Sequence, residues 1–330
     1  MQGRCQGFNC QAAVVKTLDG RSNDFSRSIA GANKATEVAT TVLIVGAGPA
    51  GLAAALELRR LGVNDIVIAE REDEAGGIPR LCGHTGFGLR DFRRVMTGPS
   101  YASRYRELIQ EAGINLRVAN TISSINANIN NHKIEAKYTG PNGVGSIEAK
   151  SVLLATGVRE RPRSARMIPG HRPQGVFTTG SLQRFVYEHH LPVGKRAVIV
   201  GAEVVSLSVV TTLLHAGVKV AAMVTELPSH QLYLPIFLPA KIWYADMLAR
   251  TKILTGKKVV NILGKERIRA LEIRDLETGN VEVVECDTVV FTGDWIPENE
   301  LARRGEVDTS TPWMGPRVEG AFRAWQMGVF

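Results

Sequence analysis

Three glycines and one acidic residue in the first quarter of the chain have the types and spacing of a dinucleotide site. Gly46, Gly48 and Gly51 form a G-x-G-x-x-G pattern, and Glu70 follows about twenty residues later. Gly46 permits a tight turn, and Gly48 lets the backbone approach a pyrophosphate. Gly51 allows a helix to pack closely on a strand, and Glu70 can accept hydrogen bonds from ribose hydroxyls. These residues predict a cofactor that carries a diphosphate.

The elements around this motif are the ones that it requires. An apolar run at 42–45 predicts a buried parallel strand, and 65–70 predicts a second strand. Between them, residues 49–61 predict a helix that stops at Gly62. The helix begins at the motif, so its free N–H groups and its positive dipole end face the phosphates.

The same strand–helix–strand unit recurs later in the chain, at 197–200, 204–215 and 218–224. Its glycine pattern is degenerate, because Glu203 stands at the central glycine position and Ser206 at the last one. A carboxylate repels a pyrophosphate and its side chain blocks close approach, so we do not expect this copy to bind NAD(P). Glu226, near the end of the last strand, is either a ribose ligand or an ordinary surface acid.

Two copies of one such unit predict an α/β protein with two Rossmann-like dinucleotide-binding domains. Further strands are expected at 122–125, 133–138, 146–149, 152–155, 259–262, 268–273, 281–284 and 288–291. The residues before Thr41 are polar and show no sustained period, so we predict a loose tail there. The predicted boundaries are 1–40 for the tail, 41–160 for the first part of one domain, 161–291 for an inserted domain, and 292–330 for the return to the first domain.

Several longer stretches resemble FAD-dependent oxidoreductases of the pyridine nucleotide-disulfide type. They are Gly76–Arg80, Cys82–Gly88, Ala155–Arg163, Gly201–Glu203 and Phe291–Pro297. The apolar run that ends in Ala155-Thr156-Gly157 resembles the second FAD signature of two-domain reductases, where a strand returns the chain to the flavin domain. The chain is most similar to the branch that holds the large subunits of opine oxidase, hydrogen cyanide synthase, dye-linked proline dehydrogenase and heterotetrameric sarcosine oxidase.

This resemblance implies an FAD domain with an inserted NAD(P)-like domain, in an FAD-dependent oxidoreductase subunit that oxidises an amine or amino-acid-type substrate. The positions expected to hold FAD are Gly46, Gly48, Pro49, Ala50, Gly51, Glu70, Arg71, Gly77, Arg80, Ala155, Thr156 and Gly157. Two alternatives stay open: an NAD(P)H-dependent flavoprotein reductase that feeds an iron–sulfur partner, and an inactive fragment that serves in binding or assembly. The expected partners are a small-molecule substrate and a second oxidoreductase or iron–sulfur subunit.

Both ends of the chain depart from the family. Cys5 and Cys10 resemble the last two cluster ligands of a bacterioferritin-associated-ferredoxin-like [2Fe-2S] module, whose first cysteine pair is missing from the sequence. Because such a cluster needs four ligands, we interpret 1–40 as a remnant and do not expect a [2Fe-2S] cluster. The family continues beyond Phe330 to a turn that contacts the flavin. We therefore interpret 292–330 as a truncated return and expect these 330 residues to hold FAD weakly.

One cysteine and one histidine lie in the glycine-rich loop that follows the first unit. Dithiol chemistry needs two cysteines a few residues apart, and only Cys82 lies in this region, so we do not expect that chemistry. His84 is the candidate catalytic residue, because a histidine titrates near neutral pH. Its other interpretation is a hydrogen-bonded structural histidine. We expect no metal site, because the sequence shows no metal-ligand spacing.

The composition is that of a soluble globular protein. The net charge is +8, from 40 basic and 32 acidic residues, which suits an anionic ligand. No concentrated run of Lys and Arg with interleaved aromatics indicates nucleic-acid binding. Four sparse cysteines and the lack of a signal-peptide pattern fit a reducing cytoplasm. The apolar stretch 42–58 is broken by glycines and Pro49, so we expect no membrane span.

Overall fold

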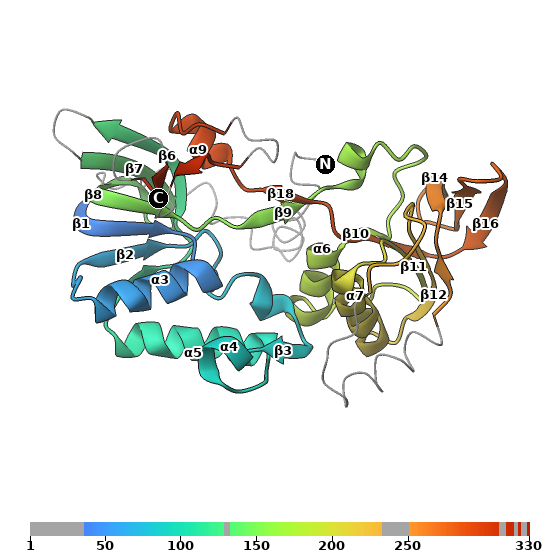
Figure 1. Cartoon of the computed structure of the whole chain (residues 1–330), viewed down its shortest axis with the longest axis horizontal. Coiled ribbons are helices and arrows are strands. Elements are labelled where there is room, and N and C mark those ends of the chain that lie inside the picture. The colour runs from blue at the N-terminus through green and yellow to red at the C-terminus, as the bar shows by residue number, and fades with distance from the viewer. Residues whose placement is uncertain (1–35, 129–132, 233–250, 310–314, 320–322, 325–328) are drawn as a thin grey trace, which may run out of the picture. The chain divides into compact units, whose positions relative to one another are not determined.

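The computed structural model describes residues 36–128, 133–232, 251–309, 315–319, 323–324 and 329–330. The chain divides into two compact units. Unit 1 contains the residues up to Arg80, Gly86–Arg159 and the residues from Ile296, and unit 2 contains Leu81–Thr85 and Glu160–Trp295. Each unit has a sheet with at least four parallel strands and helices packed on it, so the predicted α/β class with two Rossmann-like units is confirmed (Figure 1).

A six-stranded sheet in the order β5-β2-β1-β8-β7-β6 forms the centre of unit 1. Its strands are β1 (Thr36–Val45), β2 (Ile66–Ala69), β5 (Asn115–Arg117), β6 (Thr121–Asn128), β7 (Lys133–Gly140) and β8 (Gly143–Leu154). The first four strands in this order run parallel, and β7 and β6 continue antiparallel as a meander. The parallel part carries the βαβ unit, so the carboxyl ends of β1, β2 and β8 meet at one edge.

Two long helices of unit 1 cover one face of this sheet (Figure 1). They are α3 (Pro49–Arg60) and α5 (Gly98–Glu111), and their buried side chains form a core with Ile44 and Ile68. Leu43 and Val67 point to the opposite face and pack with a second set of apolar residues that includes Ala302 of α9 (Glu300–Arg304). The sheet is therefore buried on both sides, as its continuous apolar strands predict.

Unit 1 and the segments beside it also contain short elements. They are η1 (Ile78–Leu81), β3 (Thr85–Phe87), α4 (Leu89–Phe92), β4 (Met96–Thr97), β9 (Val158–Glu160), β18 (Trp295–Pro297), β19 (Val318–Glu319) and β20 (Arg323–Ala324). β9 and β18 pair with each other where the chain passes from one unit to the next and back.

Unit 2 repeats the design with a five-stranded parallel sheet in the order β10-β17-β11-β12-β13. Its strands are β10 (Val176–Thr178), β11 (Arg196–Val200), β12 (Lys219–Val224), β13 (Ile253–Leu254) and β17 (Thr288–Phe291). The helical segments are η2 (Arg163–Arg166), α6 (Thr179–Gln183), η3 (Arg184–Glu188) and α7 (Val204–His215). A small antiparallel sheet of β14 (Lys257–Leu263), β15 (Ala270–Asp275) and β16 (Val281–Glu285) completes the unit.

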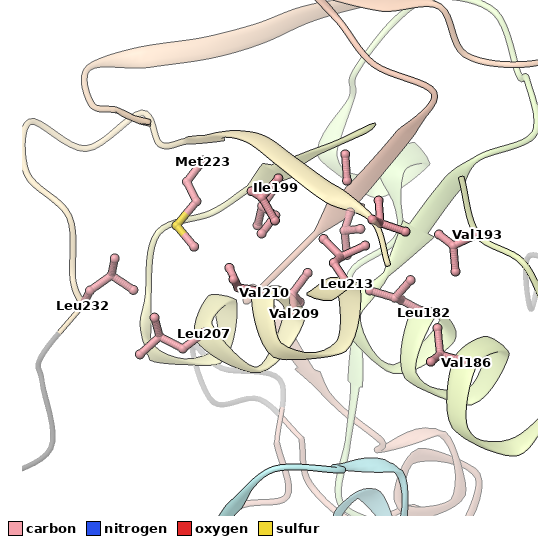
Figure 2. Close-up of a cluster of buried hydrophobic side chains, with 14 residues drawn as sticks. Leu182, Val186, Val193, Ile199, Leu207, Val209, Val210, Leu213, Met223 and Leu232 are labelled. Atoms are coloured by element: carbon pink, nitrogen blue, oxygen red, sulfur yellow. The ribbon is translucent and has the colours of Figure 1, made fainter. Parts of the chain in front are cut away.

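The parallel sheet of unit 2 is packed on both faces. One face holds Ile199 and Met223 against Leu213 of α7 and Leu182 of α6 (Figure 2). The other face packs against β14 and β15, through side chains such as Ile262. Burial on two sides fixes the register of the strands, and with it the loops at their carboxyl ends.

Two strands are longer than predicted. β1 begins at Thr36, although we expected order from Thr41, because it pairs with β8 from Thr36 opposite Gly145 onward. β8 is one strand from Gly143 to Leu154, although we expected separate strands at 146–149 and 152–155. The polar pair Lys150-Ser151 interrupts the apolar pattern without ending the strand, and Ser151 still pairs with Val42 of β1. Among the described residues, no helix is long and apolar enough to cross a membrane.

Candidate cofactor site

The loop between β1 and α3 brings the predicted glycines together at the carboxyl edge of the unit 1 sheet. Gly46 has a φ of +105°, and its N–H donates to the Ala69 carbonyl at 2.8 Å. A β-carbon at Gly46 would collide with the Ala155 carbonyl, and one at Gly51 would collide with the Gly46 carbonyl. A β-carbon at Gly48 would meet nothing within 4 Å. The protein itself therefore requires glycine at 46 and 51, whereas at Gly48 it leaves open space.

The N-terminus of α3 faces this open space. Gly48 caps the helix in an extended conformation, with φ −76° and ψ 179°, and Pro49 follows at the first helical position. The first hydrogen bond of the helix runs from Leu52 N–H to the Gly48 carbonyl at 3.0 Å. The earlier N–H groups, including those of Ala50 and Gly51, have no partner within the helix, so they are available to an anion.

Glu70 is buried beneath the loop, with 7% of its surface exposed. Its Oε2 accepts a hydrogen bond from Ala47 N–H at 2.7 Å, and its Oε1 accepts one from Glu72 N–H at 2.9 Å. These bonds compensate for burial of the carboxylate and hold the end of β2 against the glycine loop. Each carboxylate oxygen has a second lone pair, so Glu70 can still accept from a ribose hydroxyl.

On the other side of the loop, the residues after β8 contact Glu298, which the sequence analysis did not identify. Thr156 Oγ1 donates to the Glu298 carbonyl at 2.8 Å, and Glu298 N–H donates to the Gly157 carbonyl at 3.0 Å. The Glu298 carboxylate lies 3.7 Å from both Arg71 Nη1 and Arg159 Nη1. Glu298 directly follows the stretch Phe291–Pro297 that carries the family resemblance, but only the strand pairing brings it to Thr156.

The glycine-rich segment after β2 packs on the same loop. Gly76 N–H donates to the Ala47 carbonyl at 2.8 Å, and a β-carbon at Gly77 would lie 2.9 Å from Gly48 Cα. Gly77 is therefore part of the floor beside Gly48. Arg80 is directed elsewhere, because its Nη1 lies 3.2 Å from Glu74 Oε2. Arg80 was expected to hold FAD, but the alternative interpretation of an arginine in this loop is a salt bridge, and the ion pair agrees with that alternative.

The equivalent loop of unit 2 has a different content. Glu203 caps α7 in the extended conformation that Gly48 has in α3, with φ −105° and ψ 173°. A β-carbon at Gly201 would lie 2.8 Å from Glu203 Oε2, and one at Gly293 would lie 2.7 Å from Glu203 Oε1. The carboxylate therefore fills the space between the ends of β11 and β17. Glu226 is an exposed acid whose Oε2 accepts from Lys258 Nζ at 3.1 Å, as its surface interpretation predicts.

Cys82 and His84 belong to unit 2. Burial raises the pKa of the Cys82 thiol to about 11, although its hydrogen bond to Gln183 Oε1 opposes the shift. Burial likewise raises the pKa of Cys286 to about 12. His84 Nδ1 lies 2.8 Å from the Thr85 carbonyl. Nδ1 therefore carries a proton, and Nε2 holds the lone pair of the neutral ring. Cys5 and Cys10, the predicted cluster remnant, lie outside the described residues.

Comparison with known proteins identifies the family. Residues 40–312 match the family described as pyridine nucleotide-disulphide oxidoreductase, which is most of the chain. The chain belongs to the pyridine nucleotide-disulphide oxidoreductase family. The predicted recognition, the flavoprotein class and the oxidoreductase assignment are thereby confirmed.

Curated relatives of this oxidoreductase match most of the chain. The A subunit of opine oxidase from Rhizobium meliloti is 27% identical over 276 residues, which are 79% of this chain and 51% of that protein. The alpha subunit of sarcosine oxidase from Rhizobium meliloti (strain 1021) is 23% identical over 263 residues, again 79% of this chain but 25% of that protein. The chain thus spans about half or less of the length of these two relatives.

Solved structures show the same fold. The thioredoxin reductase of T. acidophilum superposes with a TM-score of 0.69 at 17% sequence identity, and the match covers 88% of each chain. At this identity the likeness describes the fold alone.

The residues present in unit 1 fit the FAD that this family implies. Open space lies above Gly48 and Gly157, because a β-carbon at either position meets nothing within 4 Å. The free N–H groups of the α3 N-terminus and the carboxylate of Glu70 border the same loop. A diphosphate and a ribose would therefore find their usual partners here. Unit 2 does not offer this space, because its Glu203 side chain fills the corresponding position.

The cysteines of this oxidoreductase lead to a labelling prediction. A thiol whose pKa is about 11 holds about a hundredfold less thiolate at pH 8 than an ordinary one. We expect iodoacetamide at pH 8 to leave Cys82 and Cys286 unlabelled in the native protein and to label both after denaturation, as mapped by peptide mass spectrometry. Fast labelling of native Cys82 would contradict its burial and would reopen thiol chemistry at this residue.

Proposed function

We propose that the chain binds FAD in unit 1 and serves as one subunit of an oxidase or dehydrogenase for an amine or amino-acid-type substrate. The observation that carries the proposal is the open glycine loop, with Gly48, the α3 N-terminus and buried Glu70 arranged as a diphosphate and ribose cradle. The substrate class is supported by the relatives, whose names contain opine and sarcosine. Sarcosine is an N-methylated amino acid.

The residues of unit 1 would bind and orient the cofactor. The N–H groups of the α3 N-terminus would hold the pyrophosphate, and Glu70 would accept from the ribose. Arg71 and Arg159, which flank the Glu298 carboxylate, line the end of β2 and the strand after Gly157. Glu298 neutralises part of their charge, so we assign it the role of a positioning residue. Bound FAD would supply the acceptor for the hydride that leaves the substrate carbon.

Oxidation of an amine also releases a proton from nitrogen, and His84 is our candidate to receive it. Its Nδ1 is held at the Thr85 carbonyl, so Nε2 has the lone pair that a general base needs. A positioned histidine of this kind accelerates proton transfer by about 10²–10⁴-fold. Cys82 is not assigned a chemical role, because burial keeps its thiol protonated.

Further protein chains are part of the proposal. The two relatives named above are subunits by name, and the chain spans about half or less of their length. We propose that this chain likewise works with further subunits, which complete the substrate site or take up the electrons.

The family name favours one alternative, a flavoprotein reductase that takes electrons from a pyridine nucleotide. In that case NADH or NADPH would bind in unit 2, at the loop that holds Glu203. A protein that serves only in binding or assembly would need no flavin at all.

An anaerobic flavin titration separates these functions. We expect sarcosine or another secondary amino acid to bleach the flavin absorbance near 450 nm in the full chain with its partner subunits, and NADH and NADPH to leave it unchanged. The His84→Gln variant should bind as much FAD but bleach at least about a hundredfold more slowly. Rapid bleaching by NADH would favour the reductase instead. Absence of flavin from the assembled protein would contradict both enzyme functions.

A further inference from the structure

The two βαβ units can be aligned by their hydrogen bonds. Gly46 N–H donates to the Ala69 carbonyl at the end of β2, and Gly201 N–H donates to the Val224 carbonyl at the end of β12, both at 2.8 Å. The next N–H donor pair also agrees, because Gly76 donates to Ala47 and Gln231 donates to Ala202. Position 203 in unit 2 therefore corresponds to position 48 in unit 1.

The side chain at position 203 lies where unit 1 leaves space for a ligand. Its carboxylate oxygens are 2.8 and 2.9 Å from the β-carbon position of Gly201, and Oε1 is 2.7 Å from that of Gly293. Thr292 N–H donates to the Val200 carbonyl at 3.0 Å after β17, as Ala155 N–H donates to the Val45 carbonyl at 2.9 Å after β8, so Gly293 stands where Thr156 stands in unit 1. The Glu203 carboxylate thus spans the same two loops that flank the open space in unit 1.

The hydrogen bonds of the loop do not account for this placement. Oε1 of Glu203 is buried and accepts no hydrogen bond from the residues that the structure describes. A buried oxygen without a donor costs about 1–3 kcal/mol. The position of Oε1 therefore needs a reason other than a hydrogen bond.

Arg166 lies against the same loop after β17 that borders this carboxylate. Its Nη2 donates to the carbonyls of Thr292 and Gly293, both at 2.9 Å, and its guanidinium lies over the Phe291 ring. Burial lowers the pKa of Arg166, and the negative charges of Asp294, Glu203 and Glu160 oppose this shift. The loop that borders the Glu203 carboxylate therefore also holds a positive charge, which favours an anion at this place.

We infer that the Glu203 carboxylate is a built-in substitute for a nucleotide diphosphate, and that it closes the unit 2 site to pyridine nucleotides. A pyrophosphate would have to displace a carboxylate of the same sign from the glycine loop. Steric exclusion and charge repulsion act together, because the side chain fills the space and carries the charge. This inference holds whatever substrate unit 1 serves.

Other side chains of the unit 2 loop obstruct a nucleotide less than Glu203 does. Leu232 follows Gln231, as Gly77 follows Gly76, but its side chain packs into the core with Leu207 and Met223 (Figure 2). Thr225 stands at the end of β12 where Glu70 stands after β2, and its hydroxyl accepts a hydrogen bond from Leu227 N–H. A threonine hydroxyl can also pair with a ribose. Replacing Glu203 alone should therefore expose a usable site.

The test is calorimetric titration of NADH and of ADP into the full chain saturated with FAD. We expect the unaltered chain to show no saturable binding up to about 1 mM, and Glu203→Gly to gain at least about tenfold in affinity for both probes. Glu203→Gln should gain less, because it removes the charge and keeps the volume. Glu226→Gln is the matched control, since Glu226 is exposed and pairs with Lys258, and it should gain nothing.

Flavin fluorescence recorded during the same titration identifies the unit that binds. Binding at unit 1 would release FAD and raise the fluorescence, whereas binding at unit 2 would leave it unchanged. Because position 203 is extended backbone that any residue adopts, Glu203→Ala replaces Glu203→Gly if the glycine lowers stability. Saturable NADH binding to the unaltered chain with FAD retained, or no gain in either folded variant, would overturn the inference.

Discussion

The Gly48→Glu variant should fold and should bind FAD far more weakly than the unaltered chain. The backbone at Gly48 is extended, and a β-carbon there meets nothing within 4 Å, so the protein itself accepts a side chain. The new carboxylate would occupy the space proposed for the pyrophosphate. Two unit charges of like sign at 4 Å repel by about 4 kcal/mol at an effective dielectric constant of 20. Affinity should therefore fall by about three powers of ten.

The control places the same charge at the other end of the same helix. Leu61 caps the C-terminus of α3 and is 64% exposed, so Leu61→Glu should bind FAD with the affinity of the unaltered chain. Flavin content after purification and quenching of flavin fluorescence on titration measure both variants, and circular dichroism of the apo-proteins checks their folding. Stoichiometric FAD in Gly48→Glu would show that the cofactor lies elsewhere.

Unit 2 supplies a natural precedent for this variant. Glu203 caps α7 with nearly the same backbone angles as Gly48, and the helix that it begins is intact over Val204–His215. A glutamate at this position is therefore compatible with the fold of the loop. The loss expected in Gly48→Glu is a loss of ligand and not of structure.

The local parts of both loops could be predicted from the sequence. The helix at 204–215 has the predicted bounds, because an apolar helical segment lies between the loop after a strand and the turn at Gly217. The turn at Gly46 was predicted from its position after a buried strand, and its φ of +105° agrees. Such features depend on residues that are neighbours in the chain, so composition and spacing are enough to find them.

The partners across each loop could not be predicted, because strand pairing brings them together over long separations. Thr156 and Glu298 are 142 residues apart and meet only when the chain returns from unit 2. Glu203 and Gly293 meet because β11 and β17 are neighbours in the sheet. The sequence indicated that Glu203 would oppose a phosphate. It contained no sign that Arg166 would donate to the Thr292 and Gly293 carbonyls beside that carboxylate, since nothing in a single arginine indicates its eventual neighbours.

The Gly51→Ala variant should destabilise unit 1 even in the absence of FAD. Two effects of opposite sign compete at this position. Alanine within a helix is favoured over glycine by about 1 kcal/mol. The added methyl group, however, would collide with the Gly46 carbonyl and lie 3.2 Å from Ile44 Cγ2. Overpacking against a core typically costs about 1–3 kcal/mol, and a backbone oxygen in a constrained turn can move less than a side chain, so we take the upper end of this range. After subtraction of the gain in helix propensity, we expect the free energy of unfolding to fall by about 2 kcal/mol.

Gly48→Ala is the matched control for this prediction, because it adds the same methyl group to the same loop where nothing lies within 4 Å. Hydrogen exchange of the α3 amides in the apo-protein measures the stability of unit 1 directly. We expect faster exchange in Gly51→Ala and unchanged exchange in Gly48→Ala, whereas FAD affinity should fall in both.

Ser206 stands at the position of unit 2 that corresponds to Gly51. Its Oγ lies 2.9 Å from Thr292 Oγ1, so the unit 2 loop accommodates a side chain there. Equal exchange in the two alanine variants would mean that the unit 1 loop can shift in the same way, and that Gly51 serves the cofactor alone.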